Sequence, residues 1–217
     1  MGNSGAPSPM SVYVDGKYAP GLTVRGERRQ LLVTSEHISW RGESMELSRV
    51  TALAYFITET KAAPTNLIAY YYYHALLRSG KQRFDVILHG RPKDDETYRA
   101  WIGTLAALRT HVEPRLMSEI LARIEHGEQF KVGHFRISRE GLHYKGLLRS
   151  KFVPWSATFQ VMPSLETMVE NVADLGVYAK NIPGDRLRKI GGIPAGTPNS
   201  VLAPALMDIC IARYQAG

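Results

Sequence analysis

Hydrophobic and polar residues alternate along two stretches of the chain, each arranged around a short polar turn. In the first stretch, hydrophobic residues recur at every second position on both sides of Ser35-Glu36. In the second, the same alternation surrounds Arg139-Glu140. Alternation of this kind is typical of strands that bury one face. The pattern predicts an antiparallel hairpin over residues 31–42 and another over residues 137–146, each followed by a third strand.

The two hairpins form an internal repeat. Residues 33–42 read VTSEHISWRG and residues 137–146 read ISREGLHYKG, at an offset of 104. Seven of these ten positions are identical or conservatively replaced, and Trp40 corresponds to Tyr144. After an insertion of four residues, Leu47 corresponds to Trp155. Because a repeat reports on the architecture of the whole chain, we expect two units of similar construction.

The first unit passes from strands into a helix. Residues 50–58 continue it as a further strand, and residues 67–88 form a hairpin closed at Ser79-Gly80. Asp94 is the predicted N-cap of the helix that follows. Hydrophobic residues then recur at three- and four-residue spacing, which predicts one buried stripe made of Tyr98, Trp101, Ile102, Leu105, Leu108 and Val112.

Two more helices are expected. Pro114 begins an apolar-faced segment that ends at Gly127, as a linker helix between the units would. The second unit closes with a helix opened by Asn199 or Ser200, whose buried face is made of Leu202, Leu206, Ile209 and Cys210. The expected organisation is a disordered leader over residues 1–10, a first domain over 11–112, a linker helix over 113–127 and a second domain over 128–217.

Strands that are followed by one terminal helix, twice in succession, predict a mainly β (α+β) protein. We expect two bent-sheet, partly open barrels, each closed by its C-terminal helix. The residues quoted above, together with Leu47-Ser48-Arg49-Val50 and Val153-Pro154-Trp155-Ser156, resemble the bacterial pleckstrin-homology-like (PH-like) domains. The resemblance covers about residues 25–112 and 128–214, so it implies two tandem PH-like units.

The second copy is similar to an uncharacterised bacterial PH-like family with an Ile-Pro-Asn motif before its helix. Here Thr197-Pro198-Asn199 stands in that place, and Ala157-Thr158 replaces a residue that is usually apolar. The resemblance implies a fold and transfers no catalytic residues.

Composition narrows the classes of function. The chain has 217 residues, of which 44% are hydrophobic and 22% charged, as in folded proteins. The net charge of +7 favours acidic partners, and its even spread along the chain excludes a dedicated nucleic-acid arm. No segment is long and apolar enough to span a bilayer. The lone Cys210 excludes a disulfide framework and, with no export signal, favours a cytoplasmic protein.

Enzyme signatures are absent from the sequence. It contains no His-Glu-x-x-His, no Gly-x-Ser-x-Gly, no phosphate loop and no Cys-x-x-Cys. The seven histidines form no i,i+4 pair, and Cys210 lies on an apolar helix face, as buried structural thiols do. We therefore expect no catalytic residues, no cofactor and no metal.

Four consecutive tyrosines, residues 70–73, form the first candidate contact surface. On a strand, two of them face the core and two face outward. We assign Tyr71 and Tyr73 to partner binding, with Tyr70 and Tyr72 as the alternative pair, because aromatic residues are enriched in binding hot spots. Nucleic-acid stacking is not expected, since no Lys or Arg is interleaved with the tyrosines. The Pro/Gly-rich loop over residues 182–199 adds the candidate contacts Arg186, Arg188 and Lys189.

A basic stretch over residues 131–151 is the second candidate surface. In PH-like domains that bind phosphoinositides, basic residues of the first strands and their turn face the headgroup. The resemblance assigns that role to Lys145, Arg149 and Lys151. However, basic residues that alternate along a strand point to opposite faces. We therefore expect a non-enzymatic module that docks an acidic protein partner, as a regulatory or immunity protein would. The alternative is peripheral binding to anionic phospholipid headgroups.

Overall fold

The chain forms two compact units. The computed structural model describes residues 12–14, 17–19, 23–24, 27–28, 31–65, 67–145, 150–163, 175–180 and 186–214. The predicted leader over residues 1–10 lies outside them. One unit comprises Met1–Thr51 with Ile57–Arg115, and the other comprises Ala52–Phe56 with Leu116–Gly217. The unit boundary therefore falls within the helix over residues 113–125, and a five-residue strand segment groups with the second unit.

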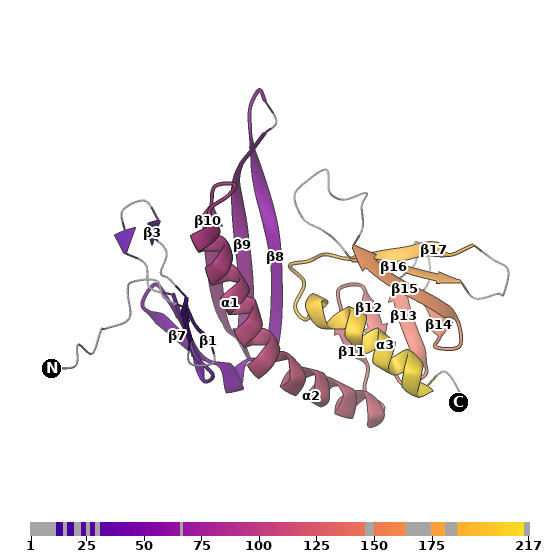
Figure 1. Ribbon diagram of the computed structural model, residues 1–217. Helices are drawn as coiled ribbons and strands as arrows, with labels where there is room; N and C mark the ends of the chain where they lie inside the picture. Colours follow the sequence, from indigo (N-terminus) through magenta and orange to yellow (C-terminus); the bar gives the residue numbers. More distant parts are fainter. Residues whose placement is uncertain are drawn as a thin grey trace. The chain divides into compact units, whose positions relative to one another are not determined.

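The first unit contains two three-stranded antiparallel sheets and one helix (Figure 1). The first sheet has the order β5 (Leu31–Val33), β6 (His37–Trp40), β7 (Glu43–Glu46), and a 3-10 turn, η1 (Leu47–Arg49), follows it. The second has the order β10 (Gln82–Gly90), β9 (Leu67–Ser79), β8 (Ala52–Ala62). Helix α1 (Asp95–His111) comes next. Two short strand pairs precede these elements, β1 (Val12–Val14) with β2 (Lys17–Ala19) and β3 (Thr23–Val24) with β4 (Glu27–Arg28).

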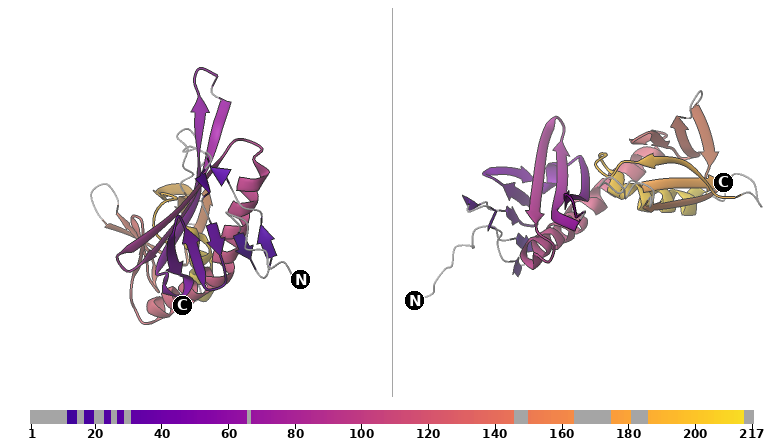
Figure 2. Two further views of the ribbon diagram at one scale, coloured as in Figure 1. Left: turned by 90° about the vertical axis from the view of Figure 1, so that its left-hand side faces the viewer. Right: turned by 90° about the horizontal axis from the view of Figure 1, so that it is seen from above.

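The second hairpin of this unit is unusually long. Its turn at Gly80 has a φ of 58°, as glycine permits, and β10 pairs with residues 71–79 of β9. Beyond the end of β10, β8 and β9 continue as a two-stranded ribbon, which both Figure 1 and the left view of Figure 2 show. The strand and the hairpin predicted over residues 50–88 are thus confirmed, but the turn lies at Gly80-Lys81, one residue later than the predicted Ser79-Gly80.

The second unit is built mainly from two antiparallel meanders. Helix α2 (Glu113–Glu125) leads into a four-stranded sheet of β11 (Phe130–Val132), β12 (Phe135–Ile137), β13 (Gly141–Lys145) and β14 (Ser150–Pro154). A three-stranded sheet follows, made of β15 (Thr158–Pro163), β16 (Leu175–Lys180) and β17 (Arg188–Ile193). The 3-10 turn η3 (Ser200–Leu202) and helix α3 (Ala203–Tyr214) end the unit. In the part of the chain that the structure describes, the protein is mainly β with three helices, and none of the sheets there closes on itself.

The two hairpins predicted from the repeat pair in the same register. The pairs are Leu31 with Trp40 and Val33 with Ile38 in β5–β6, and Phe135 with Tyr144 and Ile137 with Leu142 in β12–β13. Each pair in the second hairpin is displaced by 104 residues from its counterpart. Trp40 and Tyr144 therefore occupy matching positions, and the repeat is confirmed over residues 33–41 and 137–145.

The turns of the two hairpins are closed by the same side-chain contacts. Thr34 Oγ1 accepts the N–H of His37 at 2.9 Å and donates to its carbonyl at 3.2 Å. Ser138 Oγ makes the same two bonds with Gly141, at 3.3 and 3.1 Å. A hydroxyl that bonds the backbone three residues later favours a turn, which explains why Thr and Ser stand at this position of the repeat.

The third strand also returns to the turn in the same way in both copies. The N–H of Leu47 donates to the carbonyl of Glu36 at 2.7 Å, and the N–H of Trp155 donates to that of Glu140 at 3.4 Å. The alignment across the four-residue insertion is therefore confirmed. In the second copy, the indole N–H of Trp155 adds a bond to the carbonyl of Ser138 at 3.0 Å.

Helix α1 buries only part of the predicted stripe: Trp101, Leu108 and Val112 are buried, and Leu105 is half-buried. Asp94 caps it as predicted and accepts the N–H of Thr97 at 3.1 Å. Tyr98 and Ile102, however, are 52% and 44% exposed, so the prediction was wrong for these two. The buried residues are Thr97, Ala100, Trp101, Thr104, Ala107 and Leu108. Small residues let the helix approach closely: a Cβ on Gly90 would lie 2.8 Å from Thr97 Oγ1.

The C-terminal helix begins later than its first polar residues suggest. Asn199 and Ser200 open the 3-10 turn η3, and α3 starts at Ala203. Pro204 therefore lies in the first turn, where no backbone donor is needed. Its buried residues are Ala203, Leu206, Met207 and Cys210, whereas the predicted Ile209 is half-buried.

Candidate functional site

The four tyrosines of β9 alternate across the sheet. Tyr73 is 7% exposed, and its ring centroid lies 5.6 Å from that of Trp101 on α1. Tyr71 lies on the same face, 6.3 Å from Tyr73 between centroids, and is half-buried. Burial raises the pKa of Tyr73 above its usual value. Tyr73 thus belongs to the core under α1 and offers almost no surface to a partner.

The alternative pair, Tyr70 and Tyr72, lies on the opposite face of the sheet. The ring of Tyr72 stacks on His89 at 5.8 Å and on His74 at 6.5 Å, and Tyr70 meets His89 edge-on at 6.1 Å. The guanidinium of Arg91 lies 6.0 Å from the centre of the Tyr70 ring. All four rings are half-buried. We name these five residues the tyrosine–histidine cluster.

The register of the hairpin explains why histidines join the tyrosines. The two-residue turn at Gly80-Lys81 places Gln82 opposite Ser79, so His89 falls opposite Tyr72. Sequence reasoning missed both histidines and Arg91 as members of the surface. Counting outward from the predicted turn at Ser79-Gly80 would place His89 opposite Tyr70, on the same face of the sheet. The register with Tyr72 follows only from the observed turn at Gly80-Lys81.

His74 has the most perturbed environment in the cluster. Its Nε2 lies 2.9 Å from the Thr58 hydroxyl on the neighbouring strand. Burial lowers the pKa of His74, and the carboxylate of Asp85 offsets part of this effect. The imidazole is therefore neutral at physiological pH, which suits an aromatic contact surface better than an ion-pairing one.

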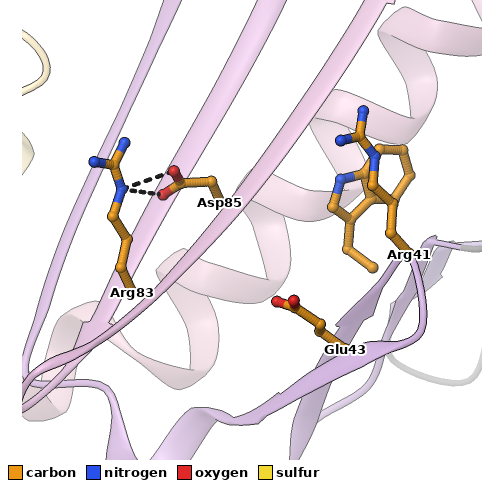
Figure 3. A pocket seen from close by; sticks show the side chains of 5 residues that line it. Arg41, Glu43, Arg83 and Asp85 are labelled. Atoms are coloured by element: carbon orange, nitrogen blue, oxygen red, sulfur yellow. Dashed lines mark hydrogen bonds and ion pairs between the residues drawn. The ribbon is translucent and has the colours of Figure 1, made fainter.

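A shallow depression of about 280 Å³ lies on the same unit (Figure 3). It is lined by Trp40, Arg41, Glu43, Arg83 and Asp85. Asp85 accepts the Nε–H of Arg83 on both carboxylate oxygens, at 2.9 and 2.7 Å. Arg41 has a φ of 55° in the β6–β7 turn, and its guanidinium lies 5.4 Å from the Trp40 ring centre.

The charges of this depression have a structural explanation. Strand β7, which carries Glu43, and strand β10, which carries Arg83 and Asp85, are edge strands of their sheets. Charged side chains on edge strands discourage pairing with another chain. Two acids and two bases also leave little net charge. The depression is therefore a weaker candidate for ligand binding than the tyrosine–histidine cluster.

The two predicted anionic-ligand residues that the structure describes, Lys145 and Lys151, do not lie on one face. Lys145 and Lys151 are both exposed, on adjacent strands β13 and β14. Lys151 pairs with Tyr144, the residue next to Lys145, so the two lysines point to opposite faces of the sheet. Arg149 lies outside the described residues. Two lysines on opposite faces do not form one headgroup site.

The predicted loop contacts are accessible. Arg186, Arg188 and Lys189 are all exposed, just before and at the start of β17. These three residues belong to the second unit, whereas the four tyrosines belong to the first. The candidate site is thus the tyrosine–histidine cluster, with these basic residues a separate surface.

Metal ligands are not grouped in the part of the chain that the structure describes. There, no three His, Cys, Asp or Glu side chains lie together so that they could bind a metal ion. None of the helices in that part combines the length and the apolarity needed to cross a membrane. Among known proteins, no family model matches the chain and no curated sequence is similar to it.

Proposed function

We propose that the chain is a tandem PH-like protein that docks a protein partner through the tyrosine–histidine cluster, as a regulatory or immunity protein would. The order of elements supports the PH-like part of this proposal. The second unit runs from a four-stranded to a three-stranded antiparallel meander and then to a helix. The first unit repeats the strands-then-helix order, and the equivalent hairpin registers tie the two together.

The cluster is the observation that supports docking. Tyr, Trp and Arg are the residues most enriched among binding hot spots. Here Tyr70, Tyr72 and Arg91 are gathered on one partly exposed face of a sheet. A sheet holds such side chains in fixed positions, so little conformational entropy is lost on binding. A neutral His74 extends the face without a desolvation penalty for a charge.

The placement of the lysines favours a protein over a lipid partner. Membrane binding by a basic turn needs several cations on one side of the protein. Lys145 and Lys151 point to opposite faces, so they do not add their contributions at a flat surface. The headgroup alternative therefore draws no support from these two residues.

The test is partner capture from the native host by the full chain and by a double variant, Tyr70→Ala with Tyr72→Ala. Tyr98→Ala is the matched control, because Tyr98 is a 52% exposed tyrosine on α1 of the same unit. We expect the wild type and the control to capture a partner protein that the double variant does not capture. Once this partner is purified, its affinity for the double variant should be about tenfold or more below its affinity for the wild type. Equal capture by all three would contradict the cluster as the docking site. Saturable binding to anionic vesicles, lost when Lys145 and Lys151 are replaced by Ala, would favour the lipid alternative instead.

A further inference from the structure

A straight row of side chains crosses the four-stranded sheet of the second unit. Lys131 on β11 pairs with Arg136 on β12, Arg136 pairs with His143 on β13, and His143 pairs with Phe152 on β14. The cations at one end are exposed, and Phe152 at the other end is 44% exposed. The rings of His143 and Phe152 lie 4.7 Å apart. We name these four residues the basic row.

The row lies on the outer face of its sheet. Most residues on either side of it along the strands point the other way and are buried, namely Phe130, Val132, Phe135, Ile137, Leu142 and Val153. Tyr144, next to His143, is half-buried, and Lys151, next to Phe152, is exposed. The strands β11 to β14 contain no acidic residue, and Lys145 adds a further cation to the outer face. Lys131, Arg136 and Lys145 make no ion pair with any residue that the structure describes.

Glu140 in the β12–β13 turn carries a carboxylate that interacts with His143 of the row. A hydrogen bond with Ser138 is the main cause that lowers the pKa of Glu140, and His143 contributes a smaller effect. The carboxylate of Glu140 is thus hydrogen-bonded within the turn of the hairpin. It does not form an ion pair with Lys131 or Arg136.

We propose that the basic row binds an acidic amphipathic helix of a partner protein, laid across the strands. Neighbouring strands are about 4.8 Å apart, so the row steps by that distance from one side chain to the next. Residues i and i+4 of a helix are separated by about 5–6 Å, which matches one step. Two acidic residues at i and i+4 would therefore meet Lys131 and Arg136.

The same helix would place an apolar residue on Phe152. Phe152 lies two strands beyond Arg136, or about 10 Å away. Seven residues of helix rise about 10.5 Å, which gives position i+11. Positions i, i+4, i+7 and i+11 lie on one helical stripe, so a single face of the helix meets the whole row. The proposed helix thus carries acidic residues at i and i+4 and an apolar residue at i+11, all on the same face.

This inference rests on the proposed docking of a protein partner, but it uses a surface other than the tyrosine–histidine cluster. The linear arrangement favours a helix over a membrane. The row presents two cations and a ring in a line, and Lys145 adds one cation beside it, whereas a bilayer attracts cations spread over a wider area.

The experiment uses the full chain and a fluorescein-labelled helical peptide with Glu at i and i+4 and Leu at i+11. A control peptide of the same composition carries its two Glu on the opposite helical face. Fluorescence anisotropy should show saturable binding of the first peptide, and binding at least about tenfold weaker of the second. Equal binding of the two peptides, or binding of neither, would overturn the proposal.

Charge exchange makes the test specific. The double variant Lys131→Glu with Arg136→Glu should bind the Glu peptide about tenfold or more weakly than the wild type does. It should bind a peptide with Lys at i and i+4 more tightly than the wild type does. Phe152→Ala should weaken the Glu peptide without altering the preference for its charge. All three positions are exposed, and circular dichroism with thermal unfolding will verify that the variants fold. A double variant that is folded but binds both peptides as the wild type does would refute the inference.

Two further arms separate the inference from the proposed function. Tyr70→Ala with Tyr72→Ala should leave peptide binding unchanged, because the tyrosines belong to the other unit. If that variant loses the native partner while no peptide binds the row, docking at the cluster stands and the basic row fails. Saturable binding to phosphatidylserine vesicles that is lost in the Lys131 and Arg136 variant, without peptide binding, would also refute the helical occupant.

Discussion

Asn199 and Leu53 are joined by two hydrogen bonds, although 146 residues separate them in the sequence. The N–H of Leu53 donates to Asn199 Oδ1 at 3.0 Å, and the N–H of Asn199 donates to the carbonyl of Leu53 at 2.6 Å. Asn199 has a left-handed φ of 62° and is 7% exposed. Asparagine tolerates this conformation better than most residues. The pair explains why the first residues of β8 belong to the second unit.

Replacing Asn199 tests this connection. Asn199→Ala leaves the buried N–H of Leu53 without its acceptor and places at positive φ a residue that tolerates this conformation less well than asparagine, so we expect a loss of about 2–4 kcal/mol in the free energy of unfolding. Asn199→Gly removes the acceptor but relieves the backbone, so its loss should be smaller. Urea denaturation measures both. If Asn199→Gly lost as much free energy of unfolding as Asn199→Ala, or more, the role assigned to the left-handed backbone would be wrong.

The buried face of α1 predicts opposite outcomes for two adjacent residues. Trp101→Ala removes a buried indole packed on Tyr73 and should cost about 3–5 kcal/mol. Ile102→Ala removes a side chain that is 44% exposed and should cost less than about 1 kcal/mol. Chemical denaturation of the two variants compares them directly. Similar losses in both would show that the helix packs through the stripe predicted from its sequence.

His74 should make stability depend on pH. Because burial lowers the pKa of His74 in the folded chain, the unfolded chain takes up the proton at a higher pH. The contribution of the neutral imidazole is complete above the unfolded value of about 6.5 and is lost as the pH falls below it toward the folded value. Between pH 7.5 and pH 5, the wild type should therefore lose more stability than His74→Gln. Parallel pH profiles of the two proteins in urea denaturation would rule out this role.

Cys210 should be inert in the folded protein. Burial on α3 raises the pKa of this thiol to about 11 and removes it from solvent. The thiolate is the reactive form, so at pH 8 a thiol reagent should react at least about a hundredfold more slowly with the native chain than with the chain in guanidinium chloride. With a chromogenic disulfide reagent, the absorbance of the thiolate that the reaction releases measures both rates. Rapid modification of the native protein would place Cys210 at the surface.

The sequence alone determined the hairpins and much of their detail. Alternation over a few residues predicts a strand and the face that it buries. A Thr or Ser hydroxyl that accepts the backbone N–H three residues later determines where the chain reverses. These are local causes, so the registers of Val33 with Ile38 and of Ile137 with Leu142 followed directly from the repeat. Asp94 capped its helix for the same reason.

The tertiary structure decided how much of the predicted stripe of α1 is buried. Helix α1 carries both large apolar residues and a row of small ones, and Trp101 and Leu108 of the predicted stripe are buried together with the small row. The small row is buried because it permits close approach to the sheet near Gly90, whereas Tyr98 and Ile102 remain exposed. Which of the Tyr71–Tyr73 and Tyr70–Tyr72 pairs faces α1 was decided in the same way, since only the position of Trp101 shows which side of β9 the helix covers. Periodicity is a property of one segment, but burial depends on the shape of a surface that another segment supplies.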